Sequence, residues 1–250
     1  MSLRVTPLAV TSDEIELGCS YVAGEKPRGV VVLLHGLPTI DPPAPDDRGY
    51  EGFARDMAEA GWLAVWADMR AVRRSPGYFS IEGWVRDAEA VVGRARAIEG
   101  TEELPLALVG VSAGGAVSAE VARRGAPVDA LALLAAPAAW VFFTEDPHEG
   151  LRRITEEAGM AVAPEVSENP TSWAAEFDSV STRASITGVS APTLILHGTD
   201  DDVVPVKHAH VIAEAAPDAE LVVLEGADHF LRQDPKAVEV LQRWLESTLR

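Results

Sequence analysis

Short, almost uninterrupted runs of apolar residues recur along this chain, and they constrain its fold more than any other feature of the sequence. These runs lie at residues 29–36, 61–70, 104–112, 128–137, 191–199 and 219–227. Runs of this kind are typical of strands that are buried on both faces of a parallel sheet. Segments with a helical apolar period lie between them, and several end at glycine. The alternation predicts an α/β fold, with a mostly parallel sheet of about eight strands covered by helices on both faces.

Two other kinds of segment break this rhythm. The opening stretches "RVTPLAV" and "EIELGCSYVAG" alternate apolar and polar residues, which favours an antiparallel pair at the sheet edge. Residues 138–190 contain no strand-like run, yet they carry several Trp and Phe side chains that need a surface to cover. We therefore expect one core, residues 1–137 and 191–250, with a small helical cap inserted at residues 138–190. The Pro- and Asp-rich stretch at residues 39–52 is a second irregular segment, whose position the sequence leaves open.

The charge balance bears on possible partners. The chain has 39 acidic against 21 basic residues, for a formal net charge of -18. Nucleic acid and anionic membranes would repel such a chain, so we expect neither as a partner. Cys19 is the single cysteine, which excludes an intrachain disulfide, and neither a signal-peptide-like N-terminus nor a long apolar span is found. These features favour a cytoplasmic protein. We also expect a monomer or homodimer whose partner is a small-molecule substrate.

The strongest local motif is "GVSAG" at residues 110–114, where an apolar run meets a helical pattern. In that context G-x-S-x-G predicts a nucleophile elbow, in which a strained turn exposes the serine, here Ser112. The next residue, Ala113, begins the helix, so its N–H and the helix dipole point toward an oxyanion formed at the serine. The alternative is an ordinary strand–helix turn, since glycine and serine are frequent in such turns.

A serine nucleophile needs a base, and the base needs an acid to orient it. His229 in "GADHF" directly follows the last apolar run. The loop after "TLILHG" offers three neighbouring carboxylates, Asp200, Asp201 and Asp202. With any of them, the order along the chain is Ser112, then Asp, then His229, which is the order of the α/β-hydrolase triad.

Four motifs in this order, "LLHGLP", "GVSAGG", "LHGTDDDVVP" and "GADHF", make the chain resemble the α/β-hydrolase superfamily over essentially its whole length. The resemblance implies the α/β-hydrolase fold. In relatives the acid loop commonly reads H-G-x-x-D-x-x-V-P, which places the acid at Asp201. It also assigns "HGLP" to the oxyanion hole, with the amide of Leu37 joining that of Ala113, while His35 and Gly36 shape the turn.

The resemblance further implies a serine hydrolase without a cofactor or metal, and we expect a carboxylesterase acting on small to medium acyl esters. The alternatives are a hydrolase of C–C bonds, amides or peptides with the same triad, or a ligand-binding protein that kept the fold. Trp140 and Phe143, which begin the cap, are the expected pocket residues. His208 and His210 lie two apart on a predicted helix and face different sides, so they do not predict a zinc site.

One motif departs from the superfamily. Many relatives carry D-x-R-G-x-G-x-S after the fourth strand, but "DMRAVRRS" has Ala71 and Arg73 where glycines are usual. We expect this stretch to follow a different path, with Arg73 and Arg74 as solvated residues near the mouth of the site. The alternative is that the two arginines bind a substrate carboxylate. The compact size resembles dienelactone-hydrolase-like relatives, but those use cysteine at the elbow, and Cys19 lies elsewhere.

Overall fold

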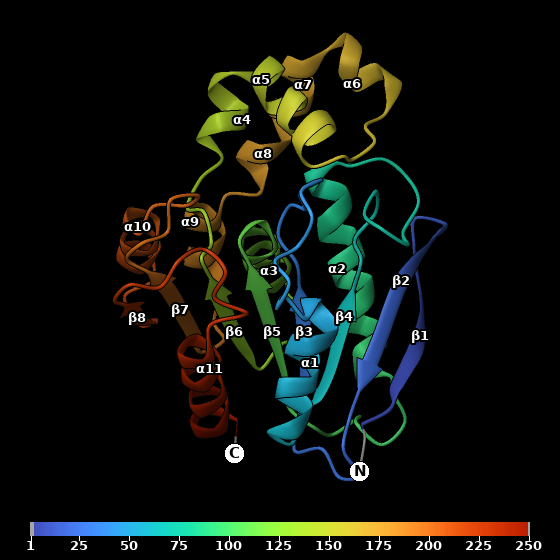
Figure 1. Ribbon diagram of the computed structural model, residues 1–250, viewed down its shortest axis with the longest axis vertical. Helices are drawn as coiled ribbons and strands as arrows, with labels where there is room; N and C mark the ends of the chain where they lie inside the picture. Colours follow the sequence, from blue (N-terminus) through green and yellow to red (C-terminus); the bar gives the residue numbers. More distant parts are fainter. Residues whose placement is uncertain (1–2, 250) are drawn as a thin grey trace.

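An eight-stranded sheet in the order β1-β2-β4-β3-β5-β6-β7-β8 forms the centre of the computed structural model, which describes residues 3–249 (Figure 1). The strands are β1 (Val5–Ser12), β2 (Ile15–Val22), β3 (Val30–Leu34), β4 (Leu63–Ala67), β5 (Leu106–Val111), β6 (Ala130–Leu134), β7 (Thr193–Gly198) and β8 (Glu220–Leu224). β2 pairs antiparallel with β1 and with β4, and all remaining pairs are parallel. The mostly parallel sheet and its antiparallel edge pair are therefore confirmed.

Burial along the strands follows their place in the sheet. Every residue of β3, β4, β5, β6 and β7 is buried, which explains why these runs lack polar alternation. β8 was expected to be equally buried, and this was wrong: all its residues are exposed or half-buried. It is the edge strand next to β7, so it has a sheet neighbour on one side only.

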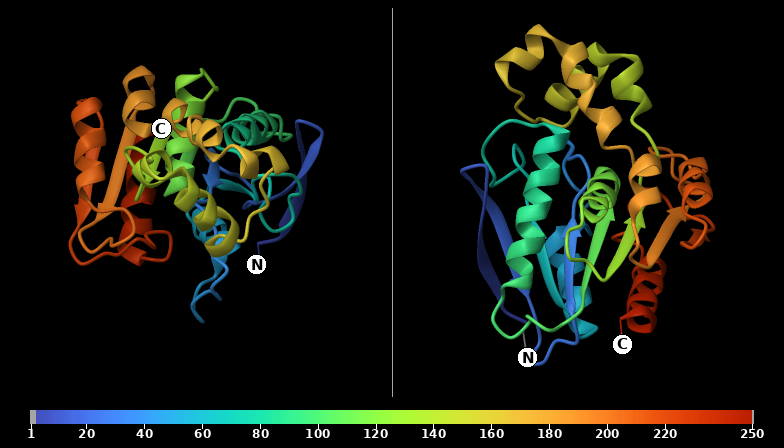
Figure 2. Two further views of the ribbon diagram at one scale, coloured as in Figure 1. Left: turned by 90° about the horizontal axis from the view of Figure 1, so that it is seen from above. Right: turned by 180° about the vertical axis from the view of Figure 1, so that it is seen from behind.

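Helices cover both faces of the sheet (Figures 1 and 2). One face carries α1 (Gly49–Glu59) and α11 (Pro235–Thr248), and the other carries α2 (Ile81–Arg96), α3 (Ala113–Arg123) and α10 (Lys207–Ala215). The two apolar clusters of the core divide in the same way, with Met57 and Leu241 in one and Val85 and Val117 in the other. Within residues 3–249, no helix has both the length and the apolar character needed to cross a bilayer.

Short helices fill the segment between β6 and β7. They are α4 (Val141–Glu145), α5 (Pro147–Arg152), the π-helix η1 (Arg153–Glu157), α6 (Pro164–Glu168), α7 (Pro170–Ala174), α8 (Glu176–Ser179), α9 (Thr182–Ser185) and the 3-10 helix η2 (Ile186–Gly188). α4 to α8 lie above the sheet as a separate layer, whereas α9 sits beside α3 and α10 at the level of the core (Figure 1). We call the layer from α4 to α8 the cap.

Candidate active site

Ser112 lies in the sharp turn between β5 and α3. Its backbone has φ 53° and ψ -123°, a conformation that non-glycine residues rarely adopt. Two backbone hydrogen bonds hold the turn, from the Ser112 N–H to the Leu134 oxygen (2.8 Å) and from the Gly115 N–H to the Ser112 oxygen (2.8 Å). A strained backbone held by its neighbours is what a nucleophile elbow requires.

Glycines on both sides of the elbow allow other backbone to approach closely. A Cβ on Gly114 would lie 2.5 Å from the His35 carbonyl oxygen, so α3 could not pack this closely against the end of β3 with a larger residue. A Cβ on Gly36 would lie 2.8 Å from the Ser112 Cβ. The "HGLP" turn therefore rests directly against the candidate nucleophile.

Two backbone amides beside Ser112 have no protein acceptor. Within residues 3–249, the N–H groups of Leu37 and Ala113 donate to no backbone or side-chain atom. Ala113 is the first residue of α3, an 11-residue helix whose N-terminal end carries partial positive charge. Both amides can therefore donate to a negatively charged oxygen formed at the serine.

His35 connects the ends of two strands next to this turn. Its Nε2 accepts the Met69 N–H (2.9 Å) and its Nδ1–H donates to the Gly36 oxygen (2.7 Å), which ties the end of β3 to the end of β4. Burial lowers the pKa of His35 to about 4, so the ring is neutral at pH 7. Its bonds place His35 in the role of shaping the turn.

Of the three neighbouring carboxylates, only Asp201 is buried. Its Oδ1 accepts the N–H groups of Val203 (3.0 Å) and Val204 (2.7 Å), and its Oδ2 accepts Nδ1–H of His229 (2.8 Å). Burial raises the pKa of Asp201, but the nearby His197 and His229 rings and the hydrogen bond from the Val204 N–H outweigh it and hold the pKa well below its usual range. Asp201 is therefore a charged acceptor aimed at His229.

The flanking carboxylates and one histidine complete this loop. Asp200 and Asp202 are exposed to solvent. Sequence reasoning missed His197, which is fully buried at the end of β7. Its Nε2–H donates to the Val204 oxygen (2.7 Å), and the same nitrogen lies 3.2 Å from Asp201 Oδ2. The only signal for it was its place four residues before Asp201 in the "HGTDD" stretch.

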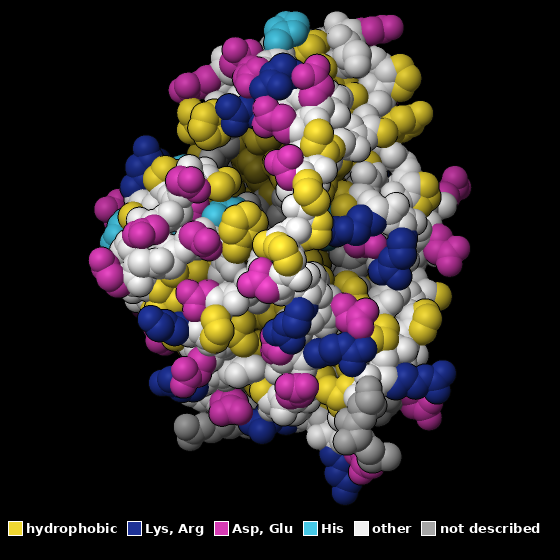
Figure 3. All heavy atoms as spheres, in the orientation of Figure 1, with side chains coloured by type: hydrophobic (Ala, Val, Ile, Leu, Met, Phe, Trp, Pro, Cys, Tyr) yellow, Lys and Arg dark blue, Asp and Glu magenta, His cyan; other side chains and the backbone are white. Residues whose placement is uncertain are grey.

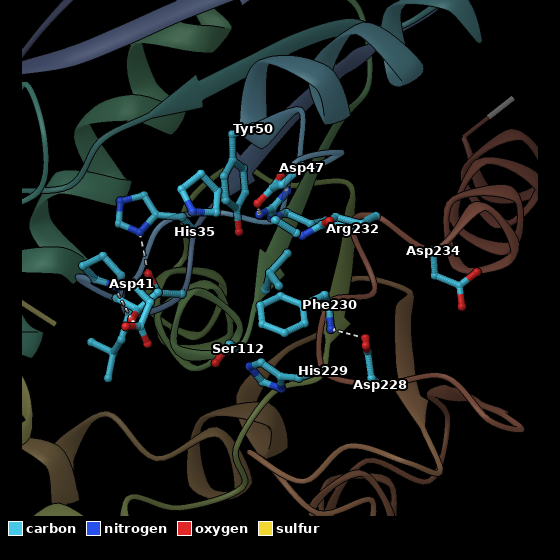
Figure 4. Close-up of a pocket in the computed structure, with 18 of the residues that line it drawn as sticks. His35, Asp41, Asp47, Tyr50, Ser112, Asp228, His229, Phe230, Arg232 and Asp234 are labelled. Carbon is cyan, nitrogen blue, oxygen red and sulfur yellow. Dashed lines mark hydrogen bonds and ion pairs between the residues drawn. The ribbon is translucent and has the colours of Figure 1, made fainter. Parts of the chain in front are cut away.

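His229 lies in the loop between β8 and α11. Because its Nδ1–H is engaged by Asp201, its Nε2 is left as the basic nitrogen. Figure 4 shows the His229 imidazole beside the Ser112 hydroxyl. The structure thus brings Ser112, Asp201 and His229 together from segments that are 28 and 89 residues apart.

A cavity of about 1000 Å³ opens over these residues. One wall is the segment from His35 to Tyr50, and the other is the segment 226–235. The 39–52 stretch, whose position the sequence left open, thus borders the cavity, and the Ile40 N–H bonds the Glu157 oxygen of the cap (2.9 Å). The same face of the molecule is hollowed below the cap, and apolar side chains border the hollow (Figure 3).

Trp140 and Phe143 are not among the residues that line this cavity, and their role as pocket residues stays a prediction. Both are buried in the aromatic core of the cap, where the Phe143 and Phe177 rings stack with centroids 4.6 Å apart. The Trp140 Nε1–H donates to the Val180 oxygen (2.7 Å). The four buried rings, those of Trp140, Phe143, Trp173 and Phe177, pack on one another.

The "DMRAVRRS" stretch also differs from expectation. Ala71 and Arg73 have φ values of 62° and 46°, so the backbone keeps the left-handed conformation that glycine favours. The prediction of a different path was therefore wrong. The side chains of Arg73 and Arg74 are more than half exposed, and both contact Asp68 (3.3 and 2.9 Å). Arg73 also borders the cavity.

The remaining histidines lie apart from the site chemistry. His208 is half-buried and its Nδ1 accepts the Ala138 N–H (3.1 Å), whereas His210 is exposed. Residues 3–249 contain no group of three or more His, Cys, Asp or Glu residues placed to hold a metal ion.

Comparison with known proteins adds a family match. Residues 25–162, more than half of the 250-residue chain, match the family described as "Serine aminopeptidase, S33". A stretch of 59 residues is 37% identical to an uncharacterized protein of Mycobacterium tuberculosis, and it covers 23% of this chain. This match spans only 17% of that protein's length.

Solved structures show the same fold at low sequence identity. Est1E from Butyrivibrio proteoclasticus, in a structure with ferulic acid bound, has a TM-score of 0.73 at 18% identity, over 96% of this chain and 98% of that chain. An esterase of Pyrococcus furiosus has a TM-score of 0.70 at 17% identity, over 99% and 94%. The 2-hydroxy-6-oxo-6-phenylhexa-2,4-dienoate hydrolase of a Rhodococcus species has a TM-score of 0.68 at 19% identity, over 99% of both chains.

Proposed function

The chain belongs to the serine aminopeptidase family of α/β-hydrolases, and from this premise we propose that it is a serine carboxylesterase that cleaves small to medium acyl esters. The observation that carries the proposal is the hydrogen bond from His229 Nδ1–H to the buried Asp201 carboxylate, with His229 beside the strained Ser112 turn. A base oriented by a charged acid next to a serine is the arrangement that activates a hydroxyl nucleophile.

In the proposed reaction, Ser112 Oγ attacks the ester carbonyl carbon while His229 Nε2 takes the hydroxyl proton. The negative charge that forms on the carbonyl oxygen is stabilised by the amides of Leu37 and Ala113. His229 then returns the proton to the departing alcohol, which leaves an acyl group on Ser112. Water, deprotonated by His229, attacks this acyl-enzyme, and His229 passes that proton to Ser112 Oγ as the acyl–oxygen bond breaks and the carboxylic acid leaves.

Asp201 acts throughout as the partner of His229. It keeps the proton on Nδ1, so that Nε2 faces the serine, and it stabilises the imidazolium that forms in each half-reaction. The low pKa of Asp201 keeps it ionised over the whole neutral range. It does not take the proton itself.

The cavity supports the choice of substrate size. Its volume of about 1000 Å³ lies at the upper end of the range common for small-molecule sites. Its walls mix apolar side chains such as Leu37 and Phe230 with polar ones such as Tyr50. Such a lining suits an ester with an apolar acyl group and a polar or aromatic alcohol.

The test is hydrolysis of p-nitrophenyl esters with acyl chains from acetyl to decanoyl by the wild type and by Ser112→Ala. We expect turnover by the wild type that falls at least about 10⁴-fold in the variant, because the nucleophile is lost. A phosphonate probe should label Ser112 in the wild type. Absence of both turnover and labelling would refute the proposal and favour a ligand-binding protein with this fold.

The family match favours a second candidate, a peptidase that uses the same residues. Aminoacyl p-nitroanilides in the same assay distinguish the two. Esters are hydrolysed faster than anilides even without an enzyme. A ratio of kcat/KM for esters to kcat/KM for anilides that far exceeds the ratio of their uncatalysed hydrolysis rates supports the esterase. A higher kcat/KM for the anilides would replace the esterase by the peptidase.

A further inference from the structure

Asp47 and Arg232 form an ion pair across the cavity. Arg232 donates two hydrogen bonds, one to each carboxylate oxygen of Asp47, and both are 2.5 Å long. The side chain of Arg232 is only 14% exposed and that of Asp47 only 10%, so solvent screens the attraction between them little. A bidentate arginine–carboxylate pair fixes the relative orientation of the two side chains as well as the distance between them.

Each partner is held by a further contact. Asp47 Oδ1 also accepts the Gly49 N–H (2.7 Å) at the start of α1. The Arg232 guanidinium lies over the Tyr50 ring, 5.2 Å from its centroid. The hydrogen bonds from Arg232 hold the pKa of Asp47 below its usual range, so the carboxylate stays charged.

The pair joins the two walls of the cavity. Asp47 follows Leu37 by ten residues in one wall, and Arg232 follows His229 by three residues in the other. Within residues 3–249, the two Asp47–Arg232 bonds are the only hydrogen bonds between these walls. Figure 4 shows Asp47, Arg232 and Tyr50 together at one end of the cavity, with Ser112 and His229 at the other.

We propose that Asp47 and Arg232 are positioning residues, whose ion pair sets the separation between the oxyanion-binding amide of Leu37 and the base His229. This inference rests on the proposed function. Each wall carries one group that must reach the same reacting carbonyl, the amide from one side and the imidazole from the other. A shift of about 1 Å between such groups lowers the rate by roughly 100-fold, so a fixed spacing between the walls matters for the reaction.

Binding of a substrate anion by Arg232 fits the contacts less well. Nη1 and Nη2 both bond Asp47, and the charge of the guanidinium is balanced by that carboxylate. The bidentate geometry also requires arginine, because a lysine ammonium is a single point charge without the planar fork.

The experiment compares Asp47→Asn, Arg232→Gln, Arg232→Lys and the double variant Asp47→Asn/Arg232→Gln on p-nitrophenyl butyrate. Asn keeps an oxygen that can accept the Gly49 N–H, so mainly the ion pair is lost. We expect kcat to fall about 10- to 100-fold in either single variant with KM changed less than about threefold, because misplacement acts on the transition state. The kcat of the double variant should be no lower than that of the less active single variant. Arg232→Lys should have a higher kcat than Arg232→Gln.

Asp129→Asn is a control at an ion pair that lies away from the cavity. Asp129 likewise accepts one arginine, Arg96, and one backbone N–H, that of Leu106, but it lies at the amino ends of β5 and β6, whereas Ser112 follows the carboxyl end of β5. Because the Asp129 side chain is 47% exposed and that of Asp47 only 10%, Asp129→Asn should lower Tm less than Asp47→Asn does. It should leave kcat within about twofold, with all rates measured well below each variant's Tm.

The outcomes separate this inference from the proposed function. A wild type without Ser112-dependent turnover would overturn both. An active wild type in which Asp47→Asn and Arg232→Lys both keep kcat within threefold would overturn the positioning role alone. Equal losses of kcat in Asp47→Asn and Asp129→Asn would also overturn it, since they would indicate a general effect of stability.

Discussion

Replacing Asp201 by asparagine changes one atom of the carboxyl group and should invert the protonation of His229. The N–H groups of Val203 and Val204 both point at Oδ1 of residue 201, and only an oxygen can accept them. The asparagine oxygen will therefore occupy that position and place its NH₂ group toward His229. His229 Nδ1 must then accept a hydrogen bond, which leaves the proton on Nε2, where it blocks the uptake of the Ser112 proton.

The size of the effect follows from the same contacts. To restore a basic Nε2, the amide must flip and leave the N–H groups of Val203 and Val204 facing an NH₂ group. Each buried donor without a partner costs about 1–3 kcal/mol, so the flip costs roughly 2–6 kcal/mol. The variant also lacks the charge that stabilises the imidazolium. We expect kcat to fall about 10³- to 10⁴-fold, the size of the loss found when the triad acid of another serine hydrolase is replaced by its amide.

The assay is the steady-state hydrolysis of p-nitrophenyl butyrate at pH 7.5, with Asp200→Asn and Asp202→Asn as controls. Both control carboxylates are exposed, and that of Asp200 accepts the neighbouring Thr199 hydroxyl. Each control should keep kcat within about threefold. If Asp201→Asn kept more than a tenth of the activity, or if a control lost as much, Asp201 would not be the acid.

Two further predictions concern the oxyanion turn and acid stability. In Gly36→Ala the new Cβ would lie 2.8 Å from Ser112 Cβ, so the turn that carries the Leu37 amide must move away from Ser112. We expect kcat to fall about 10²- to 10³-fold in steady-state assays. An unchanged kcat would contradict the close contact. Burial alone would raise the pKa of Glu120, but hydrogen bonds from Arg123, Ser185 and Arg124 lower it from 4.5 to about 2. Because the folded-state pKa is the lower one, this carboxylate stabilises the fold above pH 4.5 and loses that effect as the pH falls to 2. Thermal unfolding followed by circular dichroism should thus show a steeper loss of Tm over this range in the wild type than in Glu120→Gln, and parallel curves would contradict the role of Glu120.

The local features of the fold were predictable because each depends on neighbours in the chain. An apolar run without alternation specifies a strand buried on both faces, and this holds for β3 to β7. It failed for β8, because an edge position depends on the order of strands in the sheet, which no local pattern encodes. A second expectation, that the backbone at Ala71 and Arg73 would avoid the conformation glycine favours, also failed. Both residues have a left-handed backbone that their residue types disfavour.

The candidate site shows the same division. The sequence by itself determined the residue types and the order of Ser112, Asp201 and His229, because a strained elbow and its partners need those residues at the ends of strands. Only the tertiary structure decided that Oδ2 of Asp201 accepts the His229 N–H with a second imidazole 3.2 Å away, that the cap aromatics pack on one another, and that Asp47 meets Arg232 across 185 residues. The physical reason is that turn chemistry and strand burial are set by covalent neighbours, whereas such contacts depend on where distant loops come to lie once the whole core has packed.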